Sequence, residues 1–455
     1  MRLVVVSNRV ALETGKIAAG GLAVALTAAL EELHGLWFGW SGTLEEELSD
    51  RPHLIERDGI TYATVDLDPE DFSGYYKGYA NQTLWPLFHY RPDLASANHG
   101  FFESYRKVNT LFARQLAEML KPGDIVWVHD YHLIPLGEEL RQLGVKVPIG
   151  FFLHTPFPVP QIMTALFNHQ TLLPSLLAYD LVGFQTPDDL RAFEDYITQE
   201  LGGIISNSHL ARHAGRTVQG GVFPIGLDPD AFAALAVSEE AQHHHQQVLK
   251  SLAGRDLVIG VDRLDYSKGL PERLKGIECL LANHPERCGT LTLVQIAASS
   301  RSDLPEYIDI REELEITCGR INGRFSRYDW VPIRYVNQPY SQAALAGLYR
   351  AAKVGLVTSL RDGMNLVAKE YVAAQDPEDP GVLVLSQFAG ASHELEQALI
   401  VNPYDVRAIG EAVDQALHMP LAERRERWCN MMDVLRRNDI TCWRERFVTA
   451  LQLAT

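Results

Sequence analysis

The stretch that decides the fold is Val261–Arg273, which reads Val-Asp-Arg-Leu-Asp-Tyr-Ser-Lys-Gly-Leu-Pro-Glu-Arg. It follows the apolar run Leu257–Val261, which is typical of a buried parallel strand. It leads into a helical pattern with Pro271 in the first turn, where a helix tolerates proline. Arg263 and Lys268 are therefore expected on a strand-to-helix loop. In an open α/β sheet such a loop lies at the carboxyl ends of the strands, where ligands bind.

The two cations of this loop have two interpretations. Beside helix N-terminal N–H groups, an arginine and a lysine predict an anion site suited to phosphate. Alternatively, the loop is solvated and its charges pair with Asp262, Asp265 and Glu272. The formal net charge of the chain is −17, which disfavours nucleic acid or an anionic membrane as the main partner. A basic cluster in so acidic a chain needs a local reason.

Length and composition indicate a soluble globular protein. At 455 residues the chain is too long for one core, and two domains of roughly 200 residues each are expected. The 5 cysteines are odd in number and form no Cys-x-x-Cys pair, which predicts a reduced cytoplasmic protein without a zinc site. The N-terminus runs into a strand without signal-peptide features, and no apolar run approaches the ~20 residues of a membrane span.

Apolar runs that end in polar residues alternate with helical patterns along the chain. The runs lie at 3–6, 124–129, 147–153, 180–186, 257–261, 291–297, 331–336, 354–358 and 382–385. This alternation predicts an α/β protein of two doubly wound, Rossmann-like domains, 1–228 and 229–455, whose strand ends face a central cleft. The polar region 227–255 contains His243–His245 and is expected to be an exposed helix face rather than a metal site.

Polar residues follow several of these runs and are candidate site residues. Arg9, Asp130 and His154 each lie at the carboxyl end of a predicted strand, where ligands bind in such sheets. For a lone histidine, capping the loop is the alternative. The pair Gly20-Gly21 before a helical pattern is laid out like a phosphate cradle, although such a pair is also typical of a tight turn.

Aromatic side chains are dense in the first domain. Trp40 stands before Ser-Gly, and residues 75–91 include Tyr76 and Trp85. Because sugar rings stack on aromatic faces, this density predicts a binding wall. A loop packed by its own aromatic side chains is the alternative.

A second site signal is the segment Arg361–Glu370, which follows the predicted strand at 354–358. Asp362-Gly363 supplies a turn and backbone N–H donors at a helix start. Glu370 lies farther along that helix, where a carboxylate can hold the hydroxyls of a ribose. A solvated surface charge is the alternative for a single acidic residue on a helix.

Seven segments, in their order and spacing, together resemble the bacterial trehalose-6-phosphate synthases. They are Ser7–Arg9, Gly20–Leu22, Trp37–Gly42, Trp127–His132, Gly150–His154, Arg263–Gly269 and Arg361–Val367. The resemblance covers essentially the whole chain and is weakest at 44–70 and 204–255. It implies the two-domain glycosyltransferase architecture called GT-B, with the last helices crossing back onto the first domain. It also implies a cytoplasmic enzyme of trehalose biosynthesis and of the stress response, assembled as a homodimer or homotetramer.

The resemblance further implies a reaction. Glucose passes from UDP-glucose to glucose 6-phosphate with retention of the anomeric configuration, giving α,α-trehalose 6-phosphate and UDP. The family needs no metal, which agrees with the lack of a convincing Asp-x-Asp cation site and with Arg263 and Lys268 as a clamp for the leaving diphosphate. Front-face attack, in which the departing phosphate oxygen takes the proton of the acceptor, is the expected mechanism.

The resemblance assigns roles residue by residue. The donor UDP-glucose is assigned to Gly21, Arg263, Lys268, Asp362, Gly363, Met364, Asn365, Leu366, Val367 and Glu370. The acceptor is assigned to Arg9, Trp40, Tyr76, Trp85, Asp130 and Arg301, with the two arginines on its phosphate. The catalytic set is Arg263, Lys268, His154 and Asp362, with His154 beside the 6-hydroxyl of the donor sugar.

Three alternatives stay open at this point. A related synthase on the same scaffold would use ADP- or GDP-glucose as donor, or glycerol 3-phosphate as acceptor. A non-catalytic protein would bind sugar phosphate without turnover, although the full set of donor-side cations speaks against it. A phosphorylase-like enzyme would carry pyridoxal phosphate on a lysine, whereas Lys268 and Lys369 stand in diphosphate-type and helical contexts.

Overall fold

The structure is a computed structural model that describes residues 2–10, 27, 30–31, 34–301 and 304–454. The predicted cradle at Gly20-Gly21, and with it the assigned donor contact Gly21, lies outside the described residues. Contacts divide the chain into two units. Unit 1 holds the described residues up to Pro224 together with the segment from Thr441 onward, and unit 2 holds Ile225–Ile440. Among the helices of the described ranges, none is long and apolar enough to cross a membrane.

Unit 1 is built on a ten-stranded sheet in the order β3-β4-β2-β1-β5-β6-β7-β10-β9-β8. Neighbours from β4 to β10 in this order are parallel, and the pairs β3–β4, β9–β10 and β8–β9 are antiparallel. The strands are β1 (Arg2–Arg9), β2 (Leu36–Leu44), β3 (His53–Arg57), β4 (Ile60–Leu67), β5 (Asp124–His129), β6 (Ile149–Phe152), β7 (Leu181–Phe184), β8 (Ile204–Ile205), β9 (Leu210–His213) and β10 (Arg216–Val222).

The helices of unit 1 include a long π-helix. They are α2 (Pro69–Phe72), the π-helix η1 (Ser73–Leu84), α3 (Trp85–Phe88), η2 (Pro92–Leu94), α4 (His99–Ala117), η3 (Tyr131–Leu133), α5 (Leu136–Gln142), α6 (Pro160–Met163), α7 (His169–Leu172), η4 (Leu173–Ala178), α8 (Pro187–Glu200) and α17 (Ile440–Leu453). Glycines let η1 pack closely on α4, because a Cβ at Gly78 would lie 2.5 Å from the ring of Phe101. The sequence predicted aromatic density here but not the π-helix.

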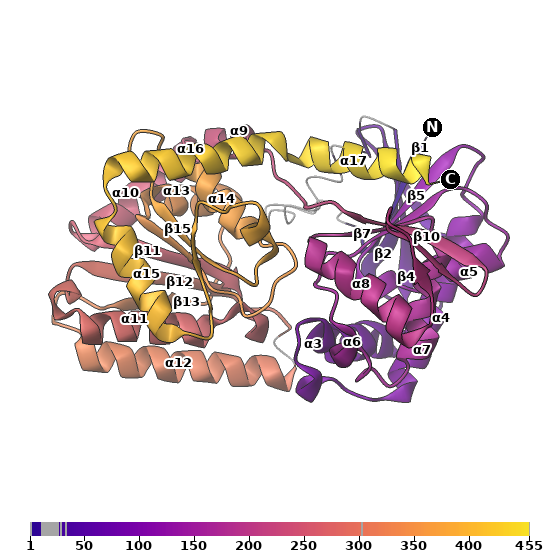
Figure 1. Ribbon diagram of the computed structural model, residues 1–455, viewed down its shortest axis with the longest axis horizontal. Coiled ribbons are helices and arrows are strands. Elements are labelled where there is room, and N and C mark those ends of the chain that lie inside the picture. The colour runs from indigo at the N-terminus through magenta and orange to yellow at the C-terminus, as the bar shows by residue number, and fades with distance from the viewer. Residues whose placement is uncertain (1, 11–26, 28–29, 32–33, 302–303, 455) are drawn as a thin grey trace. The chain divides into compact units, whose positions relative to one another are not determined.

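The C-terminal helix α17 lies beside the strands of unit 1 (Figure 1), and its aromatic rings pack against that sheet. The ring of Phe447 stacks on Trp127 of β5 with the ring centroids 4.5 Å apart. It also fills the space that side chains at Gly150 and Gly183 would take, since a Cβ there would lie within 2.8 and 2.7 Å of its ring. Burial of so large a ring contributes about 2 kcal/mol, so α17 is part of the core of unit 1.

Unit 2 has a six-stranded sheet in the order β13-β12-β11-β14-β15-β16, and every neighbouring pair in it is parallel. This is the doubly wound order, which reverses between β11 and β14 and places ligand sites outside the carboxyl ends of those strands. The strands are β11 (Asp256–Arg263), β12 (Leu291–Ala298), β13 (Ile333–Val336), β14 (Val354–Val357), β15 (Val382–Ser386) and β16 (Leu399–Val401).

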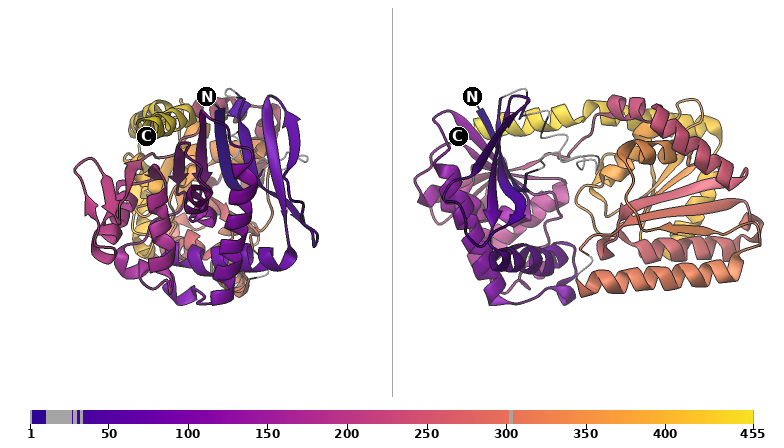
Figure 2. Two further views of the ribbon diagram at one scale, coloured as in Figure 1. Left: turned by 90° about the vertical axis from the view of Figure 1, so that its right-hand side faces the viewer. Right: turned by 180° about the vertical axis from the view of Figure 1, so that it is seen from behind.

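Two hydrophobic cores lie on the two faces of this sheet. One face is covered by α11 (Leu270–Asn283), α12 (Pro305–Phe325) and α15 (Val406–His418), and the other by α9 (Pro229–Leu235), α10 (Glu239–Leu252), α13 (Gln342–Ala351), α14 (Leu366–Ala374) and α16 (Leu421–Arg437). Short helices η5 (Tyr266–Lys268), η6 (Pro285–Arg287) and η7 (Gly390–His393) complete the unit. Figure 2 shows these layers from two further sides. Alternate residues of β11 point to opposite cores, as its apolar run predicts.

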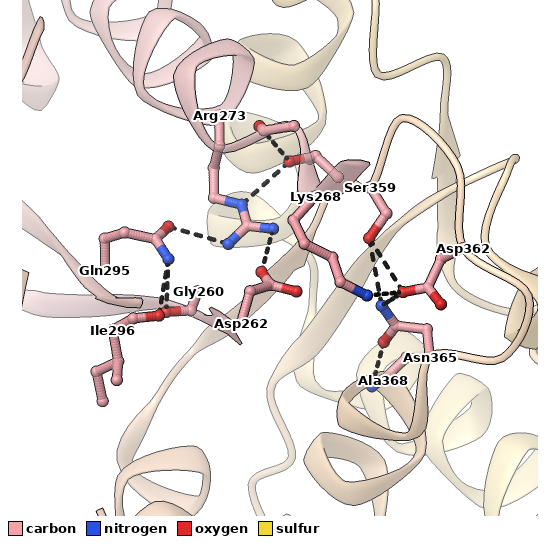
Figure 3. A network of polar contacts seen from close by, with 12 residues as sticks. Gly260, Asp262, Lys268, Arg273, Gln295, Ile296, Ser359, Asp362, Asn365 and Ala368 are labelled. Atoms are coloured by element: carbon pink, nitrogen blue, oxygen red, sulfur yellow. Dashed lines mark hydrogen bonds and ion pairs between the residues drawn. The ribbon is translucent and has the colours of Figure 1, made fainter. Parts of the chain in front are cut away.

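A wholly buried arginine ties the central strands of unit 2 together (Figure 3). Arg273 lies on α11 with 0% of its side chain exposed, and its Nη2 is 2.7 Å from Oδ2 of Asp262 at the end of β11. Its Nη1 donates to Oε1 of Gln295 on β12 at 2.9 Å, and its Nε donates to Oγ1 of Thr358 after β14 at 3.0 Å. Burial raises the pKa of Asp262 and the Arg273 charge opposes that shift.

Unit 2 begins and ends at two segments that are bonded to each other and to α14. Lys369 of α14 donates to the carbonyl oxygen of Ile225 at 2.7 Å and pairs with Glu394. The other carboxylate oxygen of Glu394 accepts from Nδ2 of Asn438 at 3.2 Å. The N–H of Ile440 donates to the carbonyl oxygen of Leu227 at 3.3 Å. The sequence placed the first boundary at 228 and 229, whereas these bonds attach the segment from Ile225 onward to unit 2.

Several elements of the fold were not predicted from the sequence. The antiparallel pairs β3–β4 and β8–β9 lie in the two regions where the motifs were weakest, 44–70 and 204–255. β3 is exposed along its whole length, so it lacks the apolar alternation that predicts a strand. The predicted exposed helix at 227–255 is two helices, α9 and α10, each capped by the side chain of the residue before it.

Replacing Arg273 tests whether its ion pair holds unit 2. Arg273→Met leaves Asp262 charged and buried, so we expect the free energy of unfolding to fall by about 4 kcal/mol. Arg320→Met is the matched control, since Arg320 also pairs with a helical carboxylate of unit 2, Glu278, but its side chain is 51% exposed; its loss should be far smaller. Denaturant titration measures both, and equal losses would contradict the structural role of Arg273.

Candidate functional site

Lys268 and Asp362 meet at the point where the strand order of unit 2 reverses (Figure 3). Nζ of Lys268 donates to Oδ2 of Asp362 at 2.6 Å, with 13% and 9% of the two side chains exposed. Lys268 follows β11, and the next residue, Gly269, has φ +62°, with no room for a Cβ because the carbonyl oxygen of Thr358 would lie 2.2 Å away. The glycine thus lets the loop after β11 touch the loop after β14.

The carboxylate of Asp362 also organises the start of α14. Its Oδ2 accepts from Nδ2 of Asn365 at 3.0 Å and from Oγ of Ser359 at 3.4 Å, and its Oδ1 accepts from the N–H of Met364 at 3.3 Å. Asn365 has φ +71° and caps α14 by accepting from the N–H of Ala368 at 3.0 Å. The predicted donor segment is therefore a compact turn that ends at a helix N-terminus, the part of a helix that attracts anions.

The loop after β15 holds this turn from behind. The N–H of Gly390 donates to the carbonyl oxygen of Asp362 at 2.9 Å, and the N–H of Ala391 donates to that of Met364 at 2.7 Å. A Cβ at Gly390 would lie 1.9 Å from the carbonyl oxygen of Gly363. Leu366 and Val367 begin α14 and are half-buried. The turn is thus fixed by backbone contacts that the sequence motif did not reveal.

Glu370 lies on α14, half-buried, and its carboxyl group is desolvated. Burial raises the pKa of Glu370 to about 7, and the neighbouring Tyr349 side chain opposes the shift. This poorly solvated carboxyl group disfavours the alternative of a solvated surface charge, and the ribose role of Glu370 stays a prediction. A poorly solvated carboxylate at this position can accept hydrogen bonds from hydroxyl groups, as contact with a ribose requires.

Arg263 and Arg301 occupy different surroundings in unit 2. Arg263 is the exposed last residue of β11. Arg301 follows β12 with φ +48°, and only 10% of its side chain is exposed. Nη1 of Arg301 donates to the hydroxyl of Tyr307 at 2.7 Å and is 3.9 Å from Oδ2 of Asp265. The sequence missed Tyr307 and the burial of Asp265.

In unit 1, Arg9 at the carboxyl end of β1 lies opposite Trp40 of β2. The guanidinium carbon of Arg9 is 5.5 Å from the Trp40 ring centroid. The ring of Tyr76 on η1 is 6.3 Å from Trp40 and stacks at 5.8 Å on His132. An arginine beside aromatic faces is chemically suited to a phosphorylated sugar.

Trp85 is more deeply placed than the other predicted acceptor residues. Its side chain is 6% exposed, and its ring lies 4.0 Å from that of His89 and 5.7 Å from that of Tyr131. Tyr131 in turn donates its hydroxyl to Oδ1 of Asn81 on η1 at 3.1 Å. Trp85 thus packs among aromatic rings at the end of the π-helix, and its assignment to the acceptor stays a prediction.

Asp130 and His154 lie side by side at the ends of β5 and β6. Asp130 has φ +75°, and its Oδ1 accepts from the N–H of His154 at 3.3 Å. Nε2 of His154 is 3.0 Å from Nδ1 of the buried His129, and Nε2 of Gln185 donates to Nδ1 of His154 at 3.3 Å. Burial lowers the pKa of His154 to about 3, and burial with the His154 charge also lowers the pKa of His129. Both imidazoles are therefore neutral at pH 7.

The structure joins the predicted residues into three groups. In unit 2, Lys268, Asp362, Met364 and Asn365 are in direct contact, and in unit 1, Arg9, Trp40 and Tyr76 form one cluster, with Asp130 and His154 as a second pair. Ser359, His129 and Tyr307 were missed. The signal for His129 was its place in the motif Trp127–His132, next to the predicted Asp130. Over the described ranges, no group of three or more His, Cys, Asp or Glu side chains is arranged to hold a metal ion.

Comparisons with known proteins place the chain among well-studied relatives. The model of glycosyltransferase family 20 matches residues 4–453. A trehalose-6-phosphate synthase from Enterobacter sp. (strain 638) is 48% identical over 456 residues, which cover 100% of this chain and 96% of the relative.

Two solved structures extend the likeness to three dimensions. A UDP-forming α,α-trehalose-phosphate synthase from Burkholderia xenovorans, in complex with glucose-6-phosphate, is 49% identical with a TM-score of 0.95 over 99% of this chain and 100% of that chain. A structure from E. coli, bound with UDP-2-fluoro glucose, is 46% identical with a TM-score of 0.95 over 99% of each chain. The predicted GT-B architecture of two Rossmann-like α/β units is confirmed.

The raised pKa of Glu370 predicts a pH dependence of stability. As pH rises from about 4.5 to about 7, an unfolded glutamate ionises while the buried one keeps its proton, so stability present below pH 4.5 is lost across this window. We expect wild type to lose about 3 kcal/mol more than Glu370→Gln between pH 4 and pH 8. Denaturant titration at each pH gives this difference, and parallel pH profiles would contradict the desolvation of Glu370.

Proposed function

The chain belongs to glycosyltransferase family 20, within its bacterial trehalose-6-phosphate synthases, and we propose that this enzyme moves glucose from UDP-glucose to glucose 6-phosphate. The products are α,α-trehalose 6-phosphate and UDP. The observation that carries the proposal is the contact between Lys268 and Asp362 at the sheet edge where the strand order of unit 2 reverses. Relatives that contain glucose-6-phosphate and UDP-2-fluoro glucose support both substrates.

The donor side of the reaction is assigned to unit 2. Lys268 and Arg263 neutralise the diphosphate, whose charge grows as the glycosidic bond breaks. The ammonium of Lys268 donates to Asp362; we propose that the donor diphosphate competes for this ammonium, so that the carboxylate can accept from hydroxyls of the donor glucose. Glu370 holds the ribose, and the backbone of residues 363–367 lines the remaining donor positions.

The acceptor, glucose 6-phosphate, needs cations that bind its phosphate dianion and aromatic faces that pack against its sugar ring. Arg9 and Arg301 are assigned to the phosphate, because an arginine binds it with two parallel N–H bonds. Trp40 and Tyr76 are assigned to the ring of glucose 6-phosphate, with Trp85 packed beneath the same aromatic region and Asp130 accepting from a sugar hydroxyl. His154 is assigned to the donor sugar; both its ring nitrogens already have protein partners, so it binds by exchanging one of these bonds.

Retention of configuration is proposed to follow from front-face attack. In this step the bond between the anomeric carbon and the diphosphate oxygen breaks, the acceptor hydroxyl oxygen bonds to the same face, and its proton passes to the departing oxygen. The lysine clamp stabilises the negative charge that develops on that oxygen. The reaction is proposed to run without a metal ion, in a cytoplasmic homodimer or homotetramer.

The first experiment measures UDP release from UDP-glucose with and without glucose 6-phosphate. We expect release only with the acceptor, no change on adding EDTA, and a 1,1-linked α,α disaccharide phosphate by NMR. Parallel assays with ADP-glucose, GDP-glucose and glycerol 3-phosphate test the related synthases. Release that ignores the acceptor, or a β linkage, would refute the proposed reaction, and a trapped glucosyl–carboxylate adduct would refute front-face attack.

Variants of the clamp test the mechanism. Lys268→Ala or Arg263→Ala removes a cation needed mainly in the transition state, so we expect kcat to fall by about 10²–10³-fold with a smaller change in KM. Lys275→Ala is the matched control, since Lys275 lies on α11 but pairs with the exposed Glu313. Steady-state kinetics measure all three, and wild-type kcat in both clamp variants would exclude the diphosphate role.

A further inference from the structure

A chain of three side chains connects the acceptor arginine of unit 2 to the loop that carries Lys268. Nη1 of Arg301 donates to the hydroxyl of Tyr307 at 2.7 Å, and that hydroxyl donates to Oδ2 of Asp265 at 3.0 Å. Oδ1 of Asp265 accepts from the N–H of Ser267 at 2.9 Å. Asp265 is 0% exposed and Tyr307 is 2% exposed. The tyrosine hydroxyl therefore stands between a guanidinium and a buried carboxylate.

The hydroxyl of Tyr307 keeps these two opposite charges apart. Nη1 of Arg301 is 3.9 Å from Oδ2 of Asp265, beyond the ~2.7–2.9 Å of a charge-assisted hydrogen bond. Burial, and next the Asp265 charge, raise the pKa of Tyr307, so its hydroxyl keeps its proton and continues to donate to the carboxylate. In a poorly solvated place the attraction between the two charges is strong. Without the hydroxyl, Arg301 would close onto Asp265.

We infer that Tyr307 is a positioning residue for the acceptor, a spacer that keeps the guanidinium of Arg301 available to the phosphate of glucose 6-phosphate. The inference rests on the proposed function, in which Arg301 binds that phosphate. If Arg301 paired directly with Asp265, the carboxylate would compete with the phosphate for the N–H donors and the positive charge of the guanidinium. Tyr307 thereby sets acceptor affinity without touching the acceptor.

Tyr307→Phe removes the hydroxyl and keeps the ring. We expect the KM for glucose 6-phosphate to rise about tenfold, equivalent to about 1.4 kcal/mol, with the KM for UDP-glucose little changed. Tyr371→Phe is the matched control. Tyr371 is also 2% exposed, and its hydroxyl donates to the carbonyl oxygen of Ala352 at 3.0 Å, ahead of β14 and so at the opposite end of the sheet. It should lose similar stability with no change in acceptor KM.

A second substitution separates the spacer role from general damage to the core. Tyr307→Phe/Asp265→Asn removes the carboxylate that would capture Arg301, while the amide oxygen can still accept from the N–H of Ser267. We expect the KM for glucose 6-phosphate to return toward the wild-type value even though the double variant is less stable. A purely structural role predicts no recovery, because Asp265→Asn removes a further contact from the same core and restores none.

The experiments distinguish failure of the spacer role of Tyr307 from failure of the proposed function. If wild type does not use glucose 6-phosphate, or if Arg301→Met leaves its KM unchanged, the proposed acceptor role fails and the spacer inference fails with it. If Arg301→Met raises the KM but Tyr307→Phe matches Tyr371→Phe, the spacer inference alone is overturned. It is also overturned if Asp265→Asn deepens the defect of Tyr307→Phe instead of relieving it.

Discussion

The burial of one guanidinium is the constraint on which unit 2 depends. Arg273 has no exposed surface, so each of its N–H groups must find an acceptor inside the protein or leave a large desolvation cost unmet. Its partners are Asp262 near the end of β11, Gln295 within the adjacent β12 and Thr358 just after β14. The need to satisfy this one cation thus ties these three neighbouring strands together. Lys268 and Asp362 lie on the loops that follow β11 and β14, two of these strands.

The charged side chains near this edge of the sheet differ in their exposure to solvent. Asp262 and Asp265 are buried, the first paired with Arg273 and the second accepting from Tyr307, whereas Arg263 is exposed. The sequence offered these charges as one solvated set or as one anion site. The structure divides them: the two aspartates support the fold and the loop, and the cations Arg263 and Lys268 carry the proposed function. Lys268 pairs with Asp362 rather than with the acidic residues of its own loop, and the anion site at this stretch stays a prediction.

The sequence predicted the parallel strands well because a strand that is buried on both faces is a continuous apolar run in the sequence, as β11 and β12 are. The residues around Lys268 and Asp362 were predicted to share a site, and the structure brings them into contact. The burial of Arg273 could not be predicted, since its partners lie far along the chain and an arginine on a helix is usually exposed. The π-helix and the spacer Tyr307 likewise depend on tertiary contacts that no local pattern encodes.

The two ends of unit 2 are hydrogen-bonded neighbours, through Ile440 and Leu227, with Lys369 and Glu394 beside them. A unit whose ends meet has the topology of an insertion into the host that surrounds it in sequence. The segment 225–440 can accordingly be excised as a fragment with its own complete sheet, and a short linker from Pro224 to Thr441 reconnects the host. The same closeness makes unit 2 a natural subject for circular permutation, with new termini opened in a surface loop.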